Sequence, residues 1–147
     1  MKSDENILIF LIDDDALFLK SLEIEFEQNL KATIKTFSTG EKCLGNLSQN
    51  PDIIVLDYYL NSIEQTAMNG CETLDEIKAI NPNIPVIMLS SQDSIDVAVN
   101  CMKHNAYDYI VKSETAFLRL QKNIAARFLS RKIVYALRWY MEKICIL

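Results

Sequence analysis

The chain has 147 residues and a formal net charge of −5, and half of its residues are hydrophobic. This length fits one domain with a core large enough to be stable without disulfides or structural metals, and the composition excludes a disordered chain. Four widely spaced cysteines include no C-x-x-C pair, which argues against a zinc site or a redox motif and favours reduced thiols. We expect a cytoplasmic protein, because no apolar run approaches a membrane span and the N-terminus lacks a signal-peptide pattern.

Short apolar runs alternate with helical patterns along the chain. The first run, residues 7–12, is followed by an amphipathic stretch that reaches about residue 29, as expected for a strand and a helix. A short strand is predicted at 33–37, and the helix after it ends before Asn50 and Pro51. The later segments repeat this pattern, with strands at 53–56, 85–89 and 107–111 and helices at 70–80, 94–104 and after 113. The alternation predicts an α/β domain with a parallel sheet.

Several residues predict where helices begin and end. Ser38 with Glu41 three residues later is a capping-box pattern, which predicts the start of the second helix. Gly70 is expected to open the third helix, and Asn105 to follow the fourth in the left-handed conformation. His104, the single histidine, lies near the end of the fourth helix, where a helix C-terminus favours a cation. We therefore expect it to be a solvated cap, not a catalytic residue.

Acidic residues follow two of the predicted strands. Asp13, Asp14 and Asp15 come directly after the first strand, and Asp57 after the third. Because the carboxyl ends of parallel strands meet at one edge of the sheet, these carboxylates are expected to lie together. Their repulsion is offset by a hard divalent cation, which prefers carboxylates, waters and phosphate oxygens. The pattern predicts that Asp14 binds the metal directly, that Asp13 helps through water or a shared proton, and that Asp15 is a helix-start charge.

A hydroxyl and an amine follow the other two strands. Ser90 comes at the end of the fourth apolar run, and Lys112 at the end of the fifth. Phosphoryl transfer is catalysed mainly by positioning and charge neutralisation, so these side chains are suited to hold phosphoryl oxygens. The set predicts an acyl-phosphate site in which Asp57 is the nucleophile.

With these residues in this order and at these spacings, the chain resembles a response regulator receiver domain of two-component signalling. The resemblance runs from about residue 6 to about residue 126. It implies that Asp57 accepts a phosphoryl group from a histidine kinase or a histidine phosphotransfer protein, with Mg²⁺ or Mn²⁺ as the cofactor. It also implies that Asp13, Asp14, Asp57 and the backbone carbonyl of Tyr59 hold the metal. The protein is then a signalling switch that assists its own phosphorylation, not an enzyme.

The resemblance further implies a conformational switch. When the phosphoryl group draws the Ser90 hydroxyl toward itself, Tyr109 is expected to turn inward into the space that is vacated. The side chain of Tyr59 is expected either to shield the acyl phosphate from water or to lie on the surface.

The fold implied by the alternation and the resemblance is a doubly wound, five-stranded parallel sheet. Right-handed crossovers give the strand order 2-1-3-4-5, with five helices. The fifth helix should finish near Arg127 in a receiver, yet the sequence contains no Gly or Pro after it. We therefore expect a receiver domain at 1–130 and a helical extension at 131–147.

Two departures from the family pattern lie beside the predicted site. Receivers carry a Gly about eight residues after the phosphoacceptor, whereas here the nearest is Gly70, thirteen residues after Asp57. The longer loop at 61–69 is expected to be either a tolerated surface insertion or a gate over the site. The second departure is Ser113, which replaces a Pro with a cis peptide; the sequence leaves the isomer of Lys112–Ser113 open.

The C-terminal part of the chain is basic. Residues 113–147 contain seven basic and two acidic residues, a net charge of +5, so residues 1–112 carry −10. Nucleic acid or an anionic membrane surface is disfavoured as a partner, because the whole chain is acidic and no DNA-binding motif appears. Apolar residues at spacings of 4, 3, 4 and 3 predict a short coiled coil that pairs with a second copy or a partner, namely Ile133, Leu137, Tyr140, Ile144 and Leu147.

Two other functions use similar residues. An aspartyl-nucleophile phosphatase on a related sheet needs a second acid two residues after the nucleophile, and that position is Tyr59. An unregulated docking module is disfavoured because the acids, the hydroxyl and the lysine are all present. The signalling switch is therefore the leading interpretation.

Overall fold

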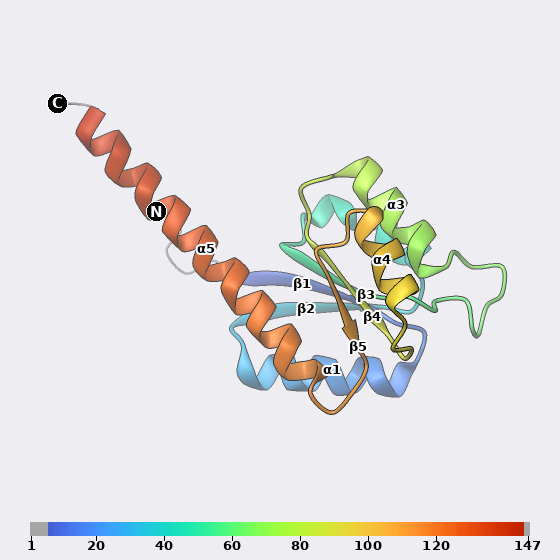
Figure 1. The fold of residues 1–147 in the computed structure, drawn as a ribbon. Helices are drawn as coiled ribbons and strands as arrows, with labels where there is room; N and C mark the ends of the chain where they lie inside the picture. The colour runs from blue at the N-terminus through green and yellow to red at the C-terminus, as the bar shows by residue number, and fades with distance from the viewer. Residues whose placement is uncertain (1–5, 146–147) are drawn as a thin grey trace.

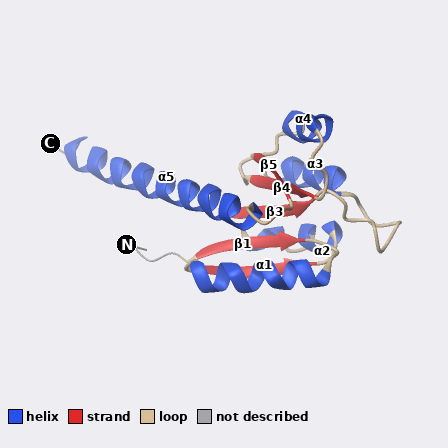
Figure 2. Cartoon of the chain, turned by 60° about the horizontal axis from the view of Figure 1, so that its bottom comes forward, coloured by secondary structure: helices blue, strands red, loops and turns tan. Residues whose placement is uncertain are grey.

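A parallel sheet of five strands lies between two layers of helices in the computed structural model, which describes residues 6–145 (Figures 1 and 2). The strand order is β2-β1-β3-β4-β5. This confirms the predicted doubly wound α/β fold and its strand order. The strands are β1 (Ile7–Ile12), β2 (Ala32–Phe37), β3 (Ile53–Asp57), β4 (Val86–Ser90) and β5 (Asp108–Val111).

Five α-helices connect and follow the strands, close to the predicted positions. Between α2 and β3 the chain adds one 3-10 turn, η1 (Leu47–Gln49). The helices are α1 (Ala16–Asn29), α2 (Gly40–Leu44), α3 (Gly70–Ile80), α4 (Ile95–Lys103) and α5 (Ala116–Cys145).

The alternation of side chains along β1 divides the core between the two faces of the sheet. Phe10 and Ile12 face α2, α3 and α4, whereas Ile9 and Leu11 face α1 and α5. Since helices cover both faces, every residue of β3 and β4 is buried. This burial explains why the strands appear in the sequence as continuous apolar runs. The polar residues that end these runs lie at the edge of the sheet.

The start of α2 differs from the prediction. Thr39 is the N-cap and its hydroxyl accepts from the Lys42 N–H, so the N-cap lies one residue after the predicted Ser38 and the capping box predicted for Ser38 and Glu41 is wrong. Ser38 instead accepts from the Lys42 ammonium, and Glu41 accepts from the Met68 N–H at 2.6 Å. Thr39 is buried and Ser38 is exposed, which favours the cap at the position where the hydroxyl is shielded from water.

Other predicted boundaries are confirmed. Gly70 opens α3, where Asn69 and Glu72 form a capping box that the sequence pattern had not revealed. Asn105 follows α4 with a φ of 68°, in the left-handed region. Every described peptide bond is trans, including Lys112–Ser113.

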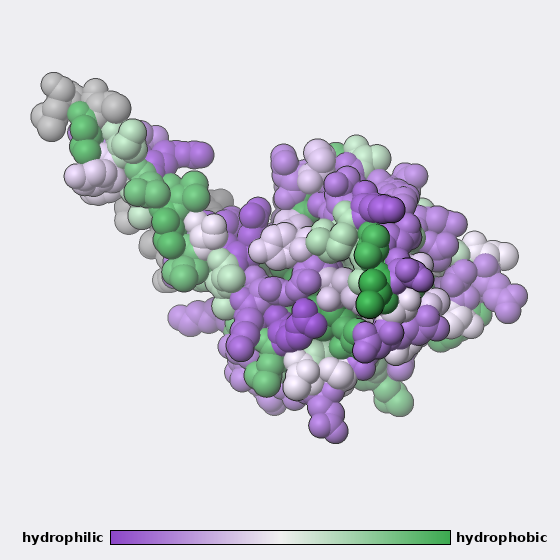
Figure 3. Space-filling view, in the orientation of Figure 1, coloured by the Kyte–Doolittle hydropathy of each residue, from purple (hydrophilic) through white to green (hydrophobic). Residues whose placement is uncertain are grey.

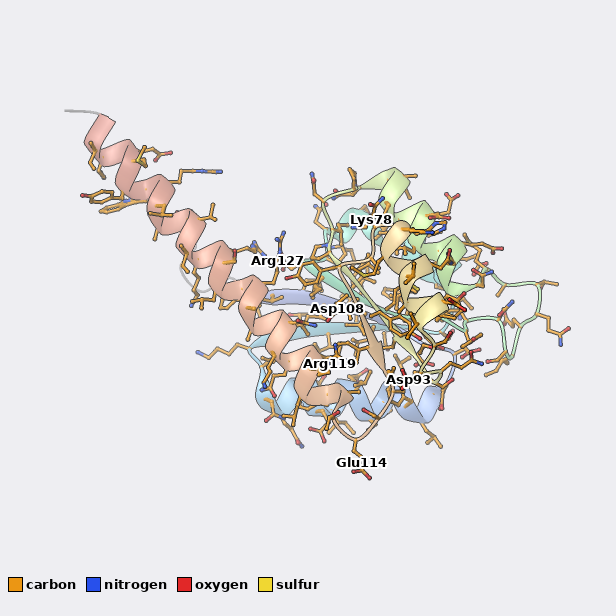
Figure 4. The ribbon with its side chains drawn as sticks, in the orientation of Figure 1. Lys78, Asp93, Asp108, Glu114, Arg119 and Arg127 are labelled. Atoms are coloured by element: carbon orange, nitrogen blue, oxygen red, sulfur yellow. The ribbon has the colours of Figure 1, made fainter. Side chains whose placement is uncertain are left out.

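Helix α5 is unbroken for 30 residues and projects well beyond the sheet (Figure 1). Its first part is tied to β5 through Asp108, whose Oδ2 lies 2.6 Å from Asn123 Nδ2 and 3.8 Å from Arg119 Nη2 (Figure 4). Arg131 pairs with Asp52 where the helix leaves the sheet. Beyond it, residues 132–144 are exposed, and hydrophobic side chains are visible along the projecting part in Figure 3. Within 6–145, no helix combines the length and apolar character needed to span a membrane.

Candidate functional site

The polar residues that follow the strands meet at one edge of the sheet. They line a cleft of about 700 Å³, together with α1 and the loop after β3. Asp13, Asp14, Asp57, Tyr59 and Lys112 all contribute to its wall. As expected for residues at the carboxyl ends of parallel strands, the predicted acids, the lysine and Tyr59 lie around one cavity.

Three carboxylates form the floor of this cleft. Oxygens of Asp13, Asp14 and Asp57 all lie within 4.8 Å of one another. The side chains of Asp13 and Asp57 are almost completely buried, with 2% and 3% of each residue exposed. Asp15 also lines the cleft but lies outside this carboxylate group, and it caps α1 by accepting from the N–H groups of Leu17 and Phe18.

Lys112 bridges two of these carboxylates. Its Nζ lies 2.8 Å from Asp13 Oδ2 and 3.3 Å from Asp57 Oδ1. It also lies 4.4 Å from the centre of the Phe18 ring, which covers the ammonium. Burial lowers the pKa of Lys112, but hydrogen bonds and charge from Asp13 and Asp57 outweigh burial, so its pKa is raised and the side chain stays cationic.

Asp57 has a strongly perturbed titration. Burial, and after it the charge of Asp13, raises the pKa of Asp57 to about 7, although Lys112 partly offsets them. A carboxyl with such a pKa is half protonated near neutrality and becomes a full carboxylate when more positive charge arrives. Perturbation of this size in a cleft is typical of a reacting group.

The donor set fits a divalent cation. Three carboxylates against one ammonium leave a formal excess of two negative charges in a largely buried site. Among the described residues, Asp13 Oδ2 and Asp57 Oδ1 have no well-directed hydrogen bond, despite the nearby ammonium. All of these donors are carboxylate oxygens, which suit a hard cation such as Mg²⁺ and not a soft one.

Ser90 and Tyr109 lie just behind the cleft and share one backbone neighbour. The Ser90 hydroxyl is fully buried and accepts from the Gln92 N–H at 3.1 Å. The Tyr109 hydroxyl donates to the Gln92 carbonyl at 2.6 Å. Gln92, and not Ser90, lines the cleft itself. No sequence signal pointed to Gln92, because its contribution comes from its backbone.

The loop after β3 contributes a contact that the sequence did not predict. Ser62 donates to Asp14 Oδ2 through both its N–H, at 3.1 Å, and its hydroxyl. Farther along, the loop returns to its starting point, where the Gly70 N–H donates to the Tyr58 carbonyl at 3.0 Å. The loop at 61–69 therefore contacts the acidic site through Ser62. Tyr59 lines the cleft with its ring edge-on to Tyr58.

Comparison with known proteins decides the family. A family model described as "Response regulator receiver domain" matches residues 9–125. The chain belongs to this family. It is a receiver domain of two-component response regulators, and the regulatory role of this domain agrees with the signalling interpretation.

Curated relatives of this receiver domain include regulators and enzymes. It is 32% identical over 110 residues to the transcriptional regulatory protein ZraR of Klebsiella oxytoca, covering 75% of this chain and 24% of that protein. It is 34% identical over 142 residues to the protein-glutamate methylesterase/protein-glutamine glutaminase of Treponema pallidum, covering 91% of this chain and 32% of that protein. The receiver domain thus spans a third or less of the length of both relatives.

Solved receiver domains share its fold. The Francisella response regulator 1452 receiver domain superposes with a TM-score of 0.74 at 24% identity, covering 86% of this chain and 99% of that one. The BeF3-activated DrrB receiver domain gives a TM-score of 0.71 at 27% identity, with coverage of 86% and 99%. The doubly wound fold is therefore that of solved receiver domains.

Proposed function

We propose that this receiver domain is a phosphorylation switch in which Asp57 accepts a phosphoryl group from a histidine kinase or a histidine phosphotransfer protein. The observation that supports this most directly is the buried Asp57 carboxylate, whose Oδ1 lies 3.3 Å from Lys112 Nζ in the wall of the cleft. Asp13 and Asp14 stand beside it with the charge that a cation requires.

In the proposed reaction a carboxylate oxygen of Asp57 forms the bond to phosphorus. The P–N bond of the donor phosphohistidine breaks, and its electron pair remains on the imidazole. Lys112, already paired with this carboxylate, neutralises charge on the phosphoryl oxygens. We assign Asp13, Asp14, Asp57 and the backbone carbonyl of Tyr59 to a Mg²⁺ or Mn²⁺ ion, which when bound supplies further charge neutralisation.

We propose that Ser90 binds a phosphoryl oxygen and that its movement on phosphorylation changes the position of Tyr109. A charge of roughly −2 on Asp57 attracts hydroxyl and amine donors, and Ser90 lies at the end of the neighbouring strand. The Ser90 hydroxyl now accepts from Gln92, whose carbonyl holds the Tyr109 hydroxyl. A movement of Ser90 therefore disturbs the hydrogen bond that fixes Tyr109 in its present place.

The other two candidate functions are not favoured. In an aspartyl-nucleophile phosphatase, a general acid would stand two residues after Asp57, but Tyr59 occupies this position and lines the cleft. In an unregulated docking module, a buried group of like charges would bring a cost in stability without a use.

The proposal predicts a covalent phosphoryl adduct. Incubation with acetyl phosphate and Mg²⁺ should add the mass of one phosphoryl group to the wild type and none to Asp57→Asn, which removes the nucleophile. The matched control is Asp93→Asn, since Asp93 is an exposed acid outside the acidic cluster, and it should be modified like the wild type (Figure 4). Intact mass spectrometry measures all three. An unmodified wild type, or an adduct that persists in Asp57→Asn, contradicts the proposal.

The Ser62 contact predicts tighter metal binding when it is removed. Ser62→Ala deletes a hydroxyl that donates to Asp14 Oδ2 and competes with a cation for that oxygen. We expect the Kd for Mg²⁺ to fall by about threefold to tenfold, measured by calorimetric titration. Ser48→Ala, an exposed serine in η1, is the control and should bind Mg²⁺ like the wild type. A weaker Mg²⁺ affinity in Ser62→Ala would mean that Ser62 orients Asp14 instead of competing for it.

We further propose that residues 1–130 are the receiver domain and residues 131–147 a helical extension, in the cytoplasm. Helix α5 packs on the sheet as far as Ile124, whereas its described side chains after Arg131 are exposed. The thiols of Cys43, Cys71 and Cys101 are free, as in a reducing compartment.

The projecting helix supports a proposal that two copies pair through it. Within residues 6–144 nothing covers the stripe of Ile133, Leu137, Tyr140 and Ile144, whose side chains are about half exposed. These residues repeat at coiled-coil spacing. Light scattering at high concentration should give a dimer for the wild type and a monomer for Leu137→Asp. Tyr135→Asp places the same charge off the stripe and should remain dimeric; a monomeric wild type, with and without phosphorylation, rules out the pairing.

A further inference from the structure

A second group of metal-binding side chains lies outside the strand-end site. Cys71 and Asp75 belong to α3, and His104 is the C-cap residue of α4. Their ligand atoms all lie within 4.8 Å of one another, and His104 Nδ1 is 2.6 Å from Asp75 Oδ1. Figures 1 and 2 show the two helices next to each other on one face of the sheet.

The backbone around this cluster is well held. Cys71 lies in the first turn of α3, whose start is fixed by the Asn69 and Glu72 capping box, and Asp75 is one turn farther on the same helix face. The Asn100 side chain of α4 donates to Cys71 Sγ at 3.6 Å. The His104 N–H donates to carbonyls of the preceding turn at the end of α4.

The chemistry of the three ligands suits zinc. A thiolate, a carboxylate and an imidazole are the ligand types of tetrahedral Zn²⁺, and the first two balance its charge. Tetrahedral bonds of about 2.0–2.3 Å place ligand atoms roughly 3–4 Å apart, so shifts of about 1 Å complete the geometry. The Asp75 side chain is 52% exposed and that of His104 37%, which leaves an approach for the ion and room for water as a fourth ligand.

We propose that Cys71, Asp75 and His104 form a zinc site that joins α3 to α4. Binding breaks the hydrogen bond between Asp75 and His104. The Cys71 thiol proton passes to solvent. The His104 Nδ1 proton, which the Asp75 carboxylate accepts in the hydrogen bond, is also released to solvent, and the neutral ring with its proton on Nε2 binds through Nδ1. This site differs from the Asp13, Asp14 and Asp57 cluster, which offers only oxygen ligands.

In the sequence, the absence of a C-x-x-C pair argued against a zinc site. That argument concerns sites formed by a local motif, and it does not exclude a site formed by residues of two helices. Cys71 and His104 belong to different helices, and 29 residues separate Asp75 from His104. The site arises from helix packing, not from a local motif.

Cobalt titration tests the site, because only a thiolate ligand gives a sulfur-to-cobalt charge-transfer band. With Mg²⁺ present at saturation, the reduced wild type should develop this band with one Co²⁺ per chain and lose it on adding Zn²⁺. The band should be absent in Cys71→Ser, and Co²⁺ should bind at least about tenfold more weakly to His104→Gln and Asp75→Asn. Cys145→Ser is the matched control and should keep the full band.

Two results would overturn the proposal. One is a wild type without the band, and the other is a band that survives in Cys71→Ser. A second observable reports on the histidine: since the chain has one His, its imidazole NMR signals should shift on adding Zn²⁺ to the wild type. Unmoved imidazole signals would exclude His104 as a ligand. Circular dichroism of each variant verifies that its fold is retained.

Discussion

Gly70→Ala is expected to destabilise the protein by about 3 kcal/mol or more and to slow its phosphorylation. A Cβ at residue 70 would lie 2.4 Å from the Asp57 carbonyl oxygen and 2.6 Å from Tyr58 Cα. Both are backbone atoms, one in the last residue of β3 and one in the residue directly after it, so relief requires movement of α3 or of β3 itself. Because that strand end carries the nucleophile, even a small displacement should lower the phosphorylation rate.

The chain contains a matched control for this prediction. Gly45, the C-cap residue of α2, has a φ of −64°, and a Cβ there would meet its nearest neighbouring atom at an ordinary 3.6 Å. Gly45→Ala should therefore be neutral or stabilising by about 0.5 kcal/mol. Urea unfolding gives the free energy of unfolding for both variants, and acetyl phosphate labelling gives their rates. Equal stability of the two variants would show that α3 and the end of β3 can move apart at little cost in free energy, which contradicts the prediction.

Asp57→Asn is expected to stabilise the metal-free protein by about 3 kcal/mol at pH 8, and by much less near pH 5. The pKa of Asp57 is raised to about 7 by burial and by the charge of Asp13, above the ordinary value of 3.8. Between these two values the folded state binds more protons than the unfolded state. The wild type therefore loses stability as the pH rises from about 4 through about 7, whereas the asparagine side chain of the variant has no proton to lose.

The measurement is urea unfolding in EDTA at several pH values, with the wild type and Asp57→Asn compared at each. The difference between their free energies of unfolding should increase as the pH rises and stay constant above about pH 8. Saturating Mg²⁺ should reduce or reverse this difference in stability, since the cation stabilises the wild-type carboxylate. Asp93→Asn is the control, because an exposed carboxylate remains hydrated when the chain folds. A difference that does not vary with pH would mean that Asp57 titrates near its ordinary value.

Prediction from sequence was strongest where burial dictates the pattern. The runs that lead to Asp57 and Ser90 are buried throughout, and the run that leads to Asp13 is buried over its last four residues, so they appear in the sequence as continuous apolar segments. The strand that leads to Lys112 lies at the edge of the sheet, and only Ile110 in it is buried. Chain order and right-handed crossovers then determine which strands are neighbours. The fold and the gathering of the acids follow from these two rules.

The contacts that the sequence did not reveal depend on the paths of loops and on backbone groups. Ser62 reaches Asp14 because the first part of the loop after β3 lies along the wall of the cleft, and no periodicity encodes that path. Gln92 joins Ser90 to Tyr109 through its peptide groups, which are common to every residue type. The error at Ser38 has a similar origin, since either of two adjacent hydroxyls can serve as an N-cap and tertiary burial selects Thr39, although only Ser38 has a Glu three residues later.

Helix α5 has the geometry of a mechanical lever. Its 30 residues span about 45 Å, and roughly half of that length lies beyond the sheet. Its base is held by Asp108, the residue next to Tyr109 in β5. A tilt of only about 5° at that base would carry the far end through about 3 Å, so a side-chain rearrangement at the edge of the sheet is magnified into a displacement that a partner helix can sense.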